Sequence, residues 1–409
     1  MRLRDLDLSV GGLQPGRRNA ITDVRGVAAG HLDLRTPATA SGLTAILPHP
    51  AGLGPQALFV GRWSVDGGEG LTGLGVAEDF GTISSPLVLA PAVAAGAVYH
   101  GLIRYGLDRD PGLSTSTGWP PLVVAIDESA GNAPAALRSG LDVEAVARVL
   151  AAAGAEVVEG TSGIGSALSS FGCPGGVGSA SRVDLGPGNW TVGLLLAASG
   201  GDPGNLAVDG YPLRSHLQPL NPPSPPGTLA VVVATDAPLI PLQLQRLAGR
   251  CAIGLARVGI LDAVTREGVA IAFSTVPAPD GDGGEREIVP EPDLEPLFQA
   301  AIEASQEAVL NALLAAADDA DDHRRIANRA NSVGQDWETE RQFLQPVTEE
   351  PFDTALTLTP RVDRYAQIMV RCNQYSVPAR FIGHRLRVKL SASHVTVYDR
   401  TTVVARHPR

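Results

Sequence analysis

The chain has 409 residues, of which 44% are hydrophobic and 18% are charged. This composition fits a folded protein of one large or two moderate domains and excludes a disordered chain. Glycine (47 residues) and proline (32 residues) are abundant but show no three-residue period, which excludes collagen and favours a loop-rich α/β or β-rich protein. Aromatic residues make up only 4%, so stacking platforms for single-stranded nucleic acid are not expected. Lys389 is the only lysine, which argues against a P-loop and against Schiff-base chemistry.

The net charge of −11 conceals two regions of opposite charge. Residues 361–409 carry ten basic side chains and two acidic ones, whereas residues 1–360 carry 22 basic and 41 acidic side chains. This split predicts two units of different origin, and it argues against polyanion binding by the larger one.

Three cysteines, Cys173, Cys251 and Cys372, lie far apart and lack the spacing of a metal site. We therefore expect no disulfide framework, no cysteine zinc site and a cytoplasmic protein. The first residues show no signal-peptide pattern. The most apolar stretch, 86–103, contains proline and glycine, and we predict a buried helix there rather than a membrane span.

Short aliphatic runs bounded by glycine or proline predict buried strands, and stretches with helical periodicity lie between them. The predicted strands are 43–47, 122–126, 192–198, 229–234 and 269–274, and the predicted helices are 86–104, 143–153, 241–257 and 294–317. Alternating strands and helices indicate α/β layers. Asp142 is suited to cap the second helix, and the acidic run 318–322 is expected to end the last one.

The C-terminal part of the chain predicts a separate small domain. Residues 323–350 show little hydrophobic periodicity, so 318–350 is expected to link a domain at 1–317 to one at 351–409. Five short runs predict the strands of a small β-barrel there: 367–373, 376–380, 386–390, 395–398 and 402–405.

Two segments are candidates for chemistry. The glycine-rich run 160–165 follows a strand-like stretch, as a dinucleotide-binding loop would, but the glycines and proline at 172–176 cannot continue the helix that such a loop requires. Tight turns and close backbone packing are the preferred interpretation. The second segment is the Gly227-Thr228 step, where a proline-rich loop enters a buried strand.

A threonine hydroxyl at the head of a buried strand can attack the preceding carbonyl and thereby cut the chain. The amine freed at Thr228, with a reference pKa of about 7.7–8.0, could then act as base for the same hydroxyl. From these residues alone, a Gly-Thr step that merely starts a strand is the simpler interpretation.

Five segments carry a wider resemblance, in the order Asn19–His31, Gly42–Pro48, Gly96–Tyr105, Phe171–Arg182 and Ala234–Arg257. Together they resemble the DmpA-type aminopeptidases, the L-aminopeptidase/D-esterase and β-peptidyl aminopeptidase family, over residues 18–316. The resemblance implies an αββα sandwich similar to that of the N-terminal-nucleophile hydrolases, self-cleavage into two chains, no metal or other cofactor, and an oligomer of processed heterodimers. It places the nucleophile at Thr228, with Gly227 on the other side of the cut.

The family's other catalytic positions fall where this chain departs from the family pattern. Ser199 stands at the position of an oxyanion-stabilising asparagine, and its hydroxyl is a shorter donor. A family Ser-Gly-Glu group corresponds to Thr265-Arg266-Glu267, displaced by one residue, for which a solvated turn is the alternative. An aromatic residue expected after the strand 122–126 is absent. The candidate catalytic residues are therefore Thr228, Ser199, Thr265 and Glu267.

A second resemblance covers residues 335–409. The stretch from Arg361 through His407 resembles the C-terminal barrel of integrase-like transposases from bacterial insertion sequences, without the acidic catalytic core of those enzymes. This implies a fusion. The ten basic residues of the tail either solubilise the barrel or give it weak, nonspecific contact with DNA.

The resemblance to the DmpA-type family implies a self-processing serine/threonine-type aminopeptidase or amidase, acting on small peptides, esters or amides with a free amino end. Two alternatives stay open. One is a catalytically impaired pseudoenzyme or fusion product, and the other is a DNA-associated protein that acts through its transposase-like tail. No membrane partner is expected.

Overall fold

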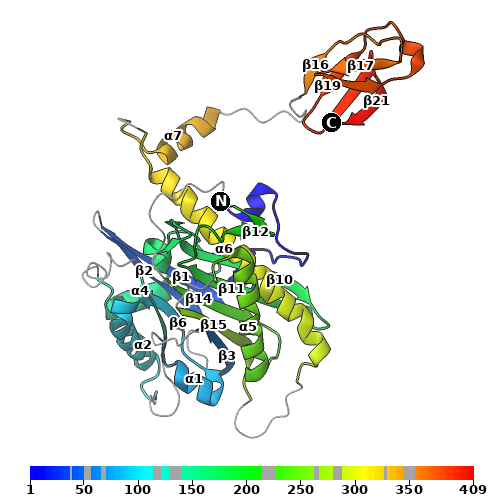
Figure 1. Cartoon of the computed structure of the whole chain (residues 1–409). Coiled ribbons are helices and arrows are strands. Elements are labelled where there is room, and N and C mark those ends of the chain that lie inside the picture. The colour runs from blue at the N-terminus through cyan, green and yellow to red at the C-terminus, as the bar shows by residue number, and fades with distance from the viewer. Residues whose placement is uncertain are drawn as a thin grey trace. The chain divides into compact units, whose positions relative to one another are not determined.

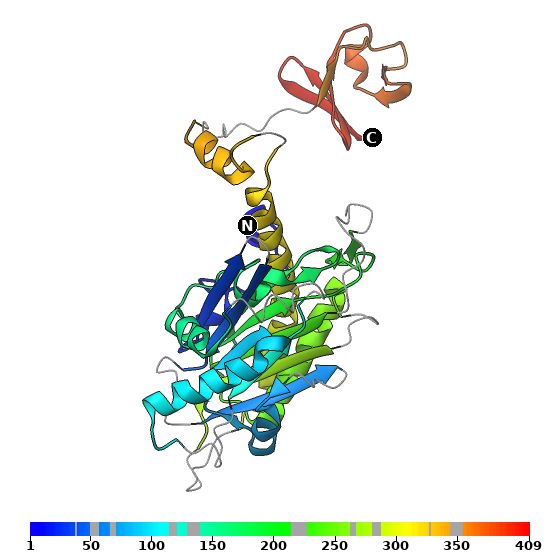
Figure 2. The same ribbon diagram turned by 90° about the vertical axis from the view of Figure 1, so that its left-hand side faces the viewer.

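The computed structural model describes residues 1–36, 39–49, 57–65, 71–113, 121–128, 140–213, 227–261, 267–279, 288–326, 329–343 and 355–409. The chain forms two compact units, Met1–Trp337 and Glu338–Arg409. Figures 1 and 2 show a layered α/β body for the larger unit and a β-rich body for the smaller one.

Two stacked sheets form the centre of the larger unit (Figure 1). The first runs in the order β1 (Ala28–Thr36), β2 (Thr39–Leu47), β6 (Leu87–Pro91), β7 (Leu122–Ile126), β4 (Leu71–Thr72). The second runs in the order β10 (Gly176–Leu185), β11 (Trp190–Ala198), β14 (Thr228–Thr235), β15 (Glu267–Pro277), β3 (Leu58–Val65), β5 (Thr82–Ile83). All five strands predicted in this part of the sequence are confirmed.

Helices cover the outer faces of both sheets, which gives the αββα sandwich that the sequence predicted. The helices are α1 (Leu74–Phe80), α2 (Ala95–Arg109), α4 (Val143–Ala151), α5 (Pro241–Val258) and α6 (Glu295–His323). The predicted cap of α4 is confirmed, because the Asp142 carboxylate accepts a hydrogen bond from the N–H of Ala145 over 3.0 Å. Shorter elements are η1 (Leu3–Leu6), η2 (Ile21–Asp23), η3 (Ala92–Ala94), η4 (Gly163–Ala167), η5 (Glu291–Leu294), β8 (Ser169–Ser170), β9 (Cys173–Pro174), β12 (Ala207–Val208) and β13 (Tyr211–Pro212).

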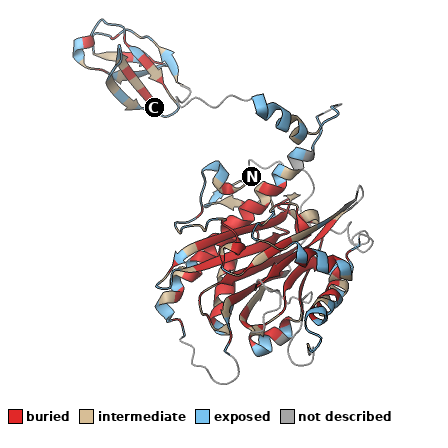
Figure 3. Cartoon of the chain, turned by 180° about the vertical axis from the view of Figure 1, so that it is seen from behind, coloured by how far each residue is buried: buried red, intermediate tan, exposed pale blue. Residues whose placement is uncertain are grey.

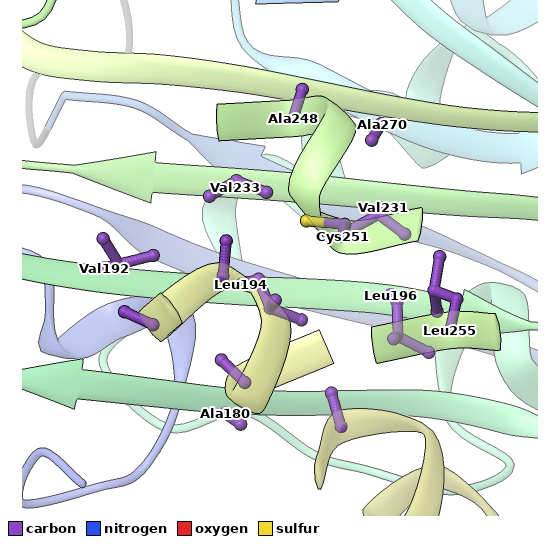
Figure 4. Close-up of a cluster of buried hydrophobic side chains, with 14 of the residues drawn as sticks. Ala180, Val192, Leu194, Leu196, Val231, Val233, Ala248, Cys251, Leu255 and Ala270 are labelled. Carbon is purple, nitrogen blue, oxygen red and sulfur yellow. The ribbon is translucent and has the colours of Figure 1, made fainter. Parts of the chain in front are cut away.

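Strand alternation divides the interior into layers, and buried residues concentrate in the sheets (Figure 3). In β14, Val231 and Val233 face α5 and α6, whereas Ala230 and Val232 face the first sheet. Figure 4 shows the layer under α5, where the Cys251 side chain meets apolar residues of the second sheet. A third apolar cluster lies between the first sheet and the helices α2 and α4.

The helix predicted over 86–104 is wrong in its first half. Residues 87–91 form β6 in the middle of the first sheet, with every residue buried, and α2 begins only after Pro91 and one short turn. Pairing with strands on both sides overrides the helical periodicity of this aliphatic run. None of the described helices is both long enough and apolar enough to cross a membrane.

Helix α6 also differs from the prediction, because it continues through the acidic run to His323. Two of the aspartates have partners there. The Met1 amine donates to Asp318 over 2.9 Å, and the Thr161 hydroxyl donates to Asp319 over 2.7 Å. These contacts with distant parts of the chain support a helical turn that its own sequence does not favour.

The glycine-rich run 160–165 forms tight turns, as the sequence indicated. Gly160 has a φ of +79°, and a Cβ on Gly165 would lie 2.4 Å from the Gly160 carbonyl oxygen. Close backbone packing therefore explains these glycines.

The smaller unit is a compact arrangement of antiparallel strands, which confirms a small β-rich domain. The single strand predicted over 367–373 is wrong, because the chain turns at 371–372 and forms a hairpin. One sheet contains β16 (Leu356–Leu358), β19 (Arg387–Leu390), β20 (His394–Asp399) and β21 (Thr402–Pro408), and a hairpin contains β17 (Gln367–Val370) and β18 (Asn373–Ser376). They share an apolar core that includes Ile368, Phe381 and Val395. The stretch 376–380 is not a strand, because the chain turns after Pro378 into η7 (Ala379–Phe381). Two helical segments precede these strands in the sequence, α7 (Val333–Glu340) and η6 (Arg341–Phe343). Neither buries a side chain.

Candidate active site

Thr228 is the first residue of β14, near the centre of the second sheet, and is 5% exposed. Alternate side chains of a strand point to the same face, so Thr228 points to the same face as Ala230 and Val232, which face the first sheet. The backbone N–H of Asp127, just after β7 of the first sheet, donates to Thr228 Oγ1 over 3.3 Å. The hydroxyl of the predicted nucleophile therefore lies between the two sheets.

Ser199 lies beside the residue that precedes Thr228. It follows β11, the strand that pairs with β14, and it is 6% exposed. A Cβ on Gly227 would lie 2.3 Å from Ser199 Oγ, so a larger residue at 227 would displace this hydroxyl. Among the residues that the structure describes, none forms a hydrogen bond with Ser199 Oγ, which leaves the hydroxyl available to a group at Gly227.

The remaining two predicted residues lie at the start of β15. Glu267 is the first residue of this strand and is the register partner of Thr228 in the parallel pair β14–β15. The backbone thus brings position 267 next to Thr228, whereas Thr265 lies outside the described residues.

Sequence reasoning missed the contribution of the first sheet. This sheet supplies the amide of Asp127. The next residue, Glu128, is buried, and its carboxylate accepts a hydrogen bond from Ser41 Oγ over 2.8 Å. Both acidic residues directly follow the buried strand β7. Polar residues at the end of a buried strand are the signal that could have marked this segment as part of the site.

A buried ionic cluster joins the regions before and after Thr228. The fully buried Arg182 donates from Nε to Glu303 Oε2 over 3.1 Å and from Nη2 to Glu307 Oε2 over 2.8 Å. Burial opposes ionisation of Glu307, but hydrogen bonds and charge from Arg4 and Arg182 outweigh it and hold the pKa of this carboxyl below its usual value. The cluster fixes α6 against β10 and against the first residues of the chain.

His31, the last residue of the first family-like segment, is held neutral. It lies in β1 opposite Thr44, with Nδ1 and Thr44 Oγ1 3.1 Å apart. Burial lowers the pKa of His31 to about 4, although the nearby charge of Asp33 acts in the opposite direction. An imidazole with this pKa carries no charge at neutral pH.

Comparison with known proteins agrees with this arrangement. Residues 19–325 match the model of Peptidase family S58, and residues 347–409 match that of the Mu transposase, C-terminal domain. The beta-peptidyl aminopeptidase BapA of Sphingosinicella microcystinivorans is 30% identical over 357 residues, covering 77% of this chain and 86% of the relative. BapA of Sphingosinicella xenopeptidilytica is 30% identical over 345 residues, covering 77% and 85%.

Three solved structures share the architecture. The PH0078 protein of Pyrococcus horikoshii OT3 has 31% identity and a TM-score of 0.70, covering 77% of this chain and 91% of that one. A Burkholderia sp. beta-aminopeptidase has 34% identity and a TM-score of 0.68, covering 77% and 92%. The l-aminopeptidase d-ala-esterase/amidase of Ochrobactrum anthropi, a variant of the Ntn hydrolase fold, has 29% identity and a TM-score of 0.68, covering 84% and 98%. The chain therefore belongs to peptidase family S58, the DmpA-type aminopeptidases, and is a hydrolase that carries a Mu transposase-type C-terminal domain.

Proposed function

We propose that this aminopeptidase cuts itself between Gly227 and Thr228 and then uses Thr228 as the nucleophile on small peptides, esters or amides with a free amino end. The names of its relatives, a beta-peptidyl aminopeptidase and an l-aminopeptidase d-ala-esterase/amidase, support this substrate class. The observation that carries the proposal is the buried Thr228 hydroxyl at the head of a central strand, with Gly227 directly before it and Ser199 beside Gly227.

In the self-cleavage step, Thr228 Oγ1 attacks the carbonyl carbon of Gly227. A C–O bond forms, the C–N bond breaks, and the hydroxyl proton passes to the departing nitrogen. Water then hydrolyses the resulting ester, which leaves a carboxylate on Gly227 and a free amine on Thr228. Ser199 Oγ donates a hydrogen bond to the oxyanion that forms in the first step.

In the hydrolytic reaction, the Thr228 amine takes the proton from its own hydroxyl as the hydroxyl attacks the substrate carbonyl. The proton is returned to the leaving group, and water releases the acyl product. Glu267, which adjoins Thr228 in the strand register, and Thr265 complete the proposed catalytic set.

Replacement of the nucleophile tests this function. Thr228→Ala should leave a single full-length chain without peptidase activity, because the attacking atom for both reactions is gone. Thr228→Ser keeps a hydroxyl and should still yield chains of 227 and 182 residues on a denaturing gel. Cleavage of the alanine variant at an unchanged rate would refute the proposal, and an intact wild-type chain would favour the pseudoenzyme alternative.

We propose a second function for the tail: it binds duplex DNA weakly and without sequence specificity. Its arginines lie at the surface, for example Arg364, Arg387 and Arg406, and no ion pair forms between two described residues of 355–409. The net positive charge of residues 361–409 favours phosphate binding. Binding of the full chain to duplex DNA should weaken steeply as salt is raised, and it should vanish when residues 335–409 are deleted.

We also propose a reducing, cytoplasmic compartment and an oligomer of processed heterodimers. All three cysteines lie in described parts of the chain and are free thiols, which suits a reducing environment. Light scattering of the processed protein measures its mass in solution and tests the proposed oligomer. A mass equal to that of one 409-residue protein would contradict the oligomer.

A further inference from the structure

The turn after β11 is held by the short hairpin β8–β9. Gly200 forms an isolated parallel bridge with Ser170. The Gly200 N–H donates to the Ser169 carbonyl over 2.9 Å, and the Phe171 N–H donates to the Gly200 carbonyl over 2.9 Å. Ser170 Oγ donates to the same Gly200 carbonyl, also over 2.9 Å. This carbonyl therefore has two donors, of which only one comes from a side chain.

The turn needs such support because its own residues are conformationally free. Gly200 and Gly201 have φ values of +90° and +84°, in the region that glycine adopts more readily than other residues. The Phe171 ring packs closely against this turn, since a Cβ on Gly201 would lie 2.8 Å from Cε1 of the ring. The hairpin thus fixes a turn whose sequence alone would leave it mobile.

The same turn contacts the peptide that is to be cut. A Cβ on Gly227 would lie 2.7 Å from the Gly200 nitrogen, and a Cβ on Gly200 would lie 3.2 Å from the Gly227 nitrogen. Since Ser199 Oγ bonds to none of the described residues, only the backbone of this turn sets its place beside Gly227.

We propose that Ser170 is a positioning residue for the reaction at Thr228, and that its hydroxyl acts by fixing the turn that presents Ser199. Ser170 is fully buried, so it acts on the reaction only through its neighbours. No proton leaves it and no bond to it forms or breaks. This inference rests on the proposed self-cleavage and hydrolysis.

Removal of the hydroxyl tests the role. In Ser170→Ala, self-cleavage should slow about tenfold, and kcat on an aminoacyl p-nitroanilide should fall by a similar factor while KM changes less than about twofold. Ser169→Ala is the matched control, because that hydroxyl donates to the Cys173 carbonyl within the same hairpin. The control should stay within about twofold of wild type in both rates.

Two further comparisons separate positioning from a loss of folding. Ser170→Thr and Ser170→Val add nearly the same volume, so only the threonine variant should retain most of the cleavage rate. In a Ser199→Ala background, Ser170→Ala should have no further effect, because the group that it positions is absent. Additive losses, or equal rates for the threonine and valine variants, would overturn the proposal. If wild type is cleaved and Ser170→Ala is cleaved equally fast, only this inference fails; if wild type is never cleaved, the proposed function fails with it.

Discussion

The two units of the chain use charged residues in opposite ways. In the sandwich, Arg182 is fully buried and is paired with Glu303 and Glu307. In the C-terminal domain, no ion pair joins two residues of 355–409, and arginines such as Arg387 and Arg406 are exposed. A buried charge requires a partner, whereas an exposed one is satisfied by water. Charge therefore organises the interior of the sandwich, whereas in the tail it lies at the surface.

The buried cluster also spans the proposed cut. Arg4 and Arg182 precede residue 228, whereas Glu303 and Glu307 follow it. Cleavage would therefore place the positive charges on one chain and the negative charges on the other. The second sheet is interleaved in the same way, since β11 pairs with β14 and β15 pairs with β3. Both features would hold the processed chains together.

Arginine substitutions give the sharpest contrast between the units. Arg182→Met should lower the free energy of unfolding of the sandwich by about 3–5 kcal/mol, because it removes the buried cation that Glu303 and Glu307 share. The matched change on an exposed strand of the tail, Arg406→Met, should alter stability by less than about 0.5 kcal/mol. Denaturant unfolding of the two variants measures both effects, and equal losses would contradict the contrast.

A pH titration tests the neutral state of His31 in the sandwich. Its pKa is about 4 when folded and 6.5 ordinarily, so between these values the unfolded chain binds a proton that the folded chain does not. The free energy of unfolding should therefore fall as the pH drops through this range, by up to about 3 kcal/mol. His31→Gln should flatten the slope between pH 6.5 and 4.5, and the difference between the variant and the wild type isolates the contribution of His31 from that of the carboxylates. An unchanged slope would show that His31 is not buried neutral.

Ser199 tests whether the turn beside Gly227 takes part in chemistry. Ser199→Ala should lower turnover by about 100-fold if its hydroxyl donates to the oxyanion. Ser199→Asn should raise turnover, because it restores the longer donor of the family pattern. Steady-state rates on one aminoacyl p-nitroanilide provide the comparison, and no change in either variant would exclude Ser199 as the donor.

Deletion of residues 335–409 should have the smallest effect on the chemistry. Every proposed catalytic residue precedes residue 268 in the sequence, and exposed charges more than about 8–10 Å apart are largely screened at physiological salt. Processing and hydrolysis should stay within a few-fold of the full chain, whereas DNA affinity should be lost. An insoluble or inactive product would show that the tail is needed by the peptidase.

Much of the fold was predictable because its strands are short aliphatic runs with clear boundaries. Strand β7 has the predicted limits, and Asp142 caps α4 as expected. The errors lie where distant contacts decide the local structure. Sheet pairing makes 87–91 a strand, and contacts with Met1 and Thr161 support the last turns of α6.

The candidate site was predictable only in part. Resemblance to the family indicated Thr228 and Ser199, and the structure brings Ser199 to the residue before Thr228. The Asp127 amide and the Gly200 carbonyl could not be found in this way, because backbone groups carry no residue-type signal. Their roles depend on how two sheets and a hairpin pack together.

The most direct test of the central claim is the intact mass of the purified protein combined with N-terminal sequencing. The account predicts two chains, of 227 and 182 residues, with Thr228 as the new amino terminus. A single chain of 42.3 kDa after prolonged incubation, or a new terminus at another residue, would contradict it.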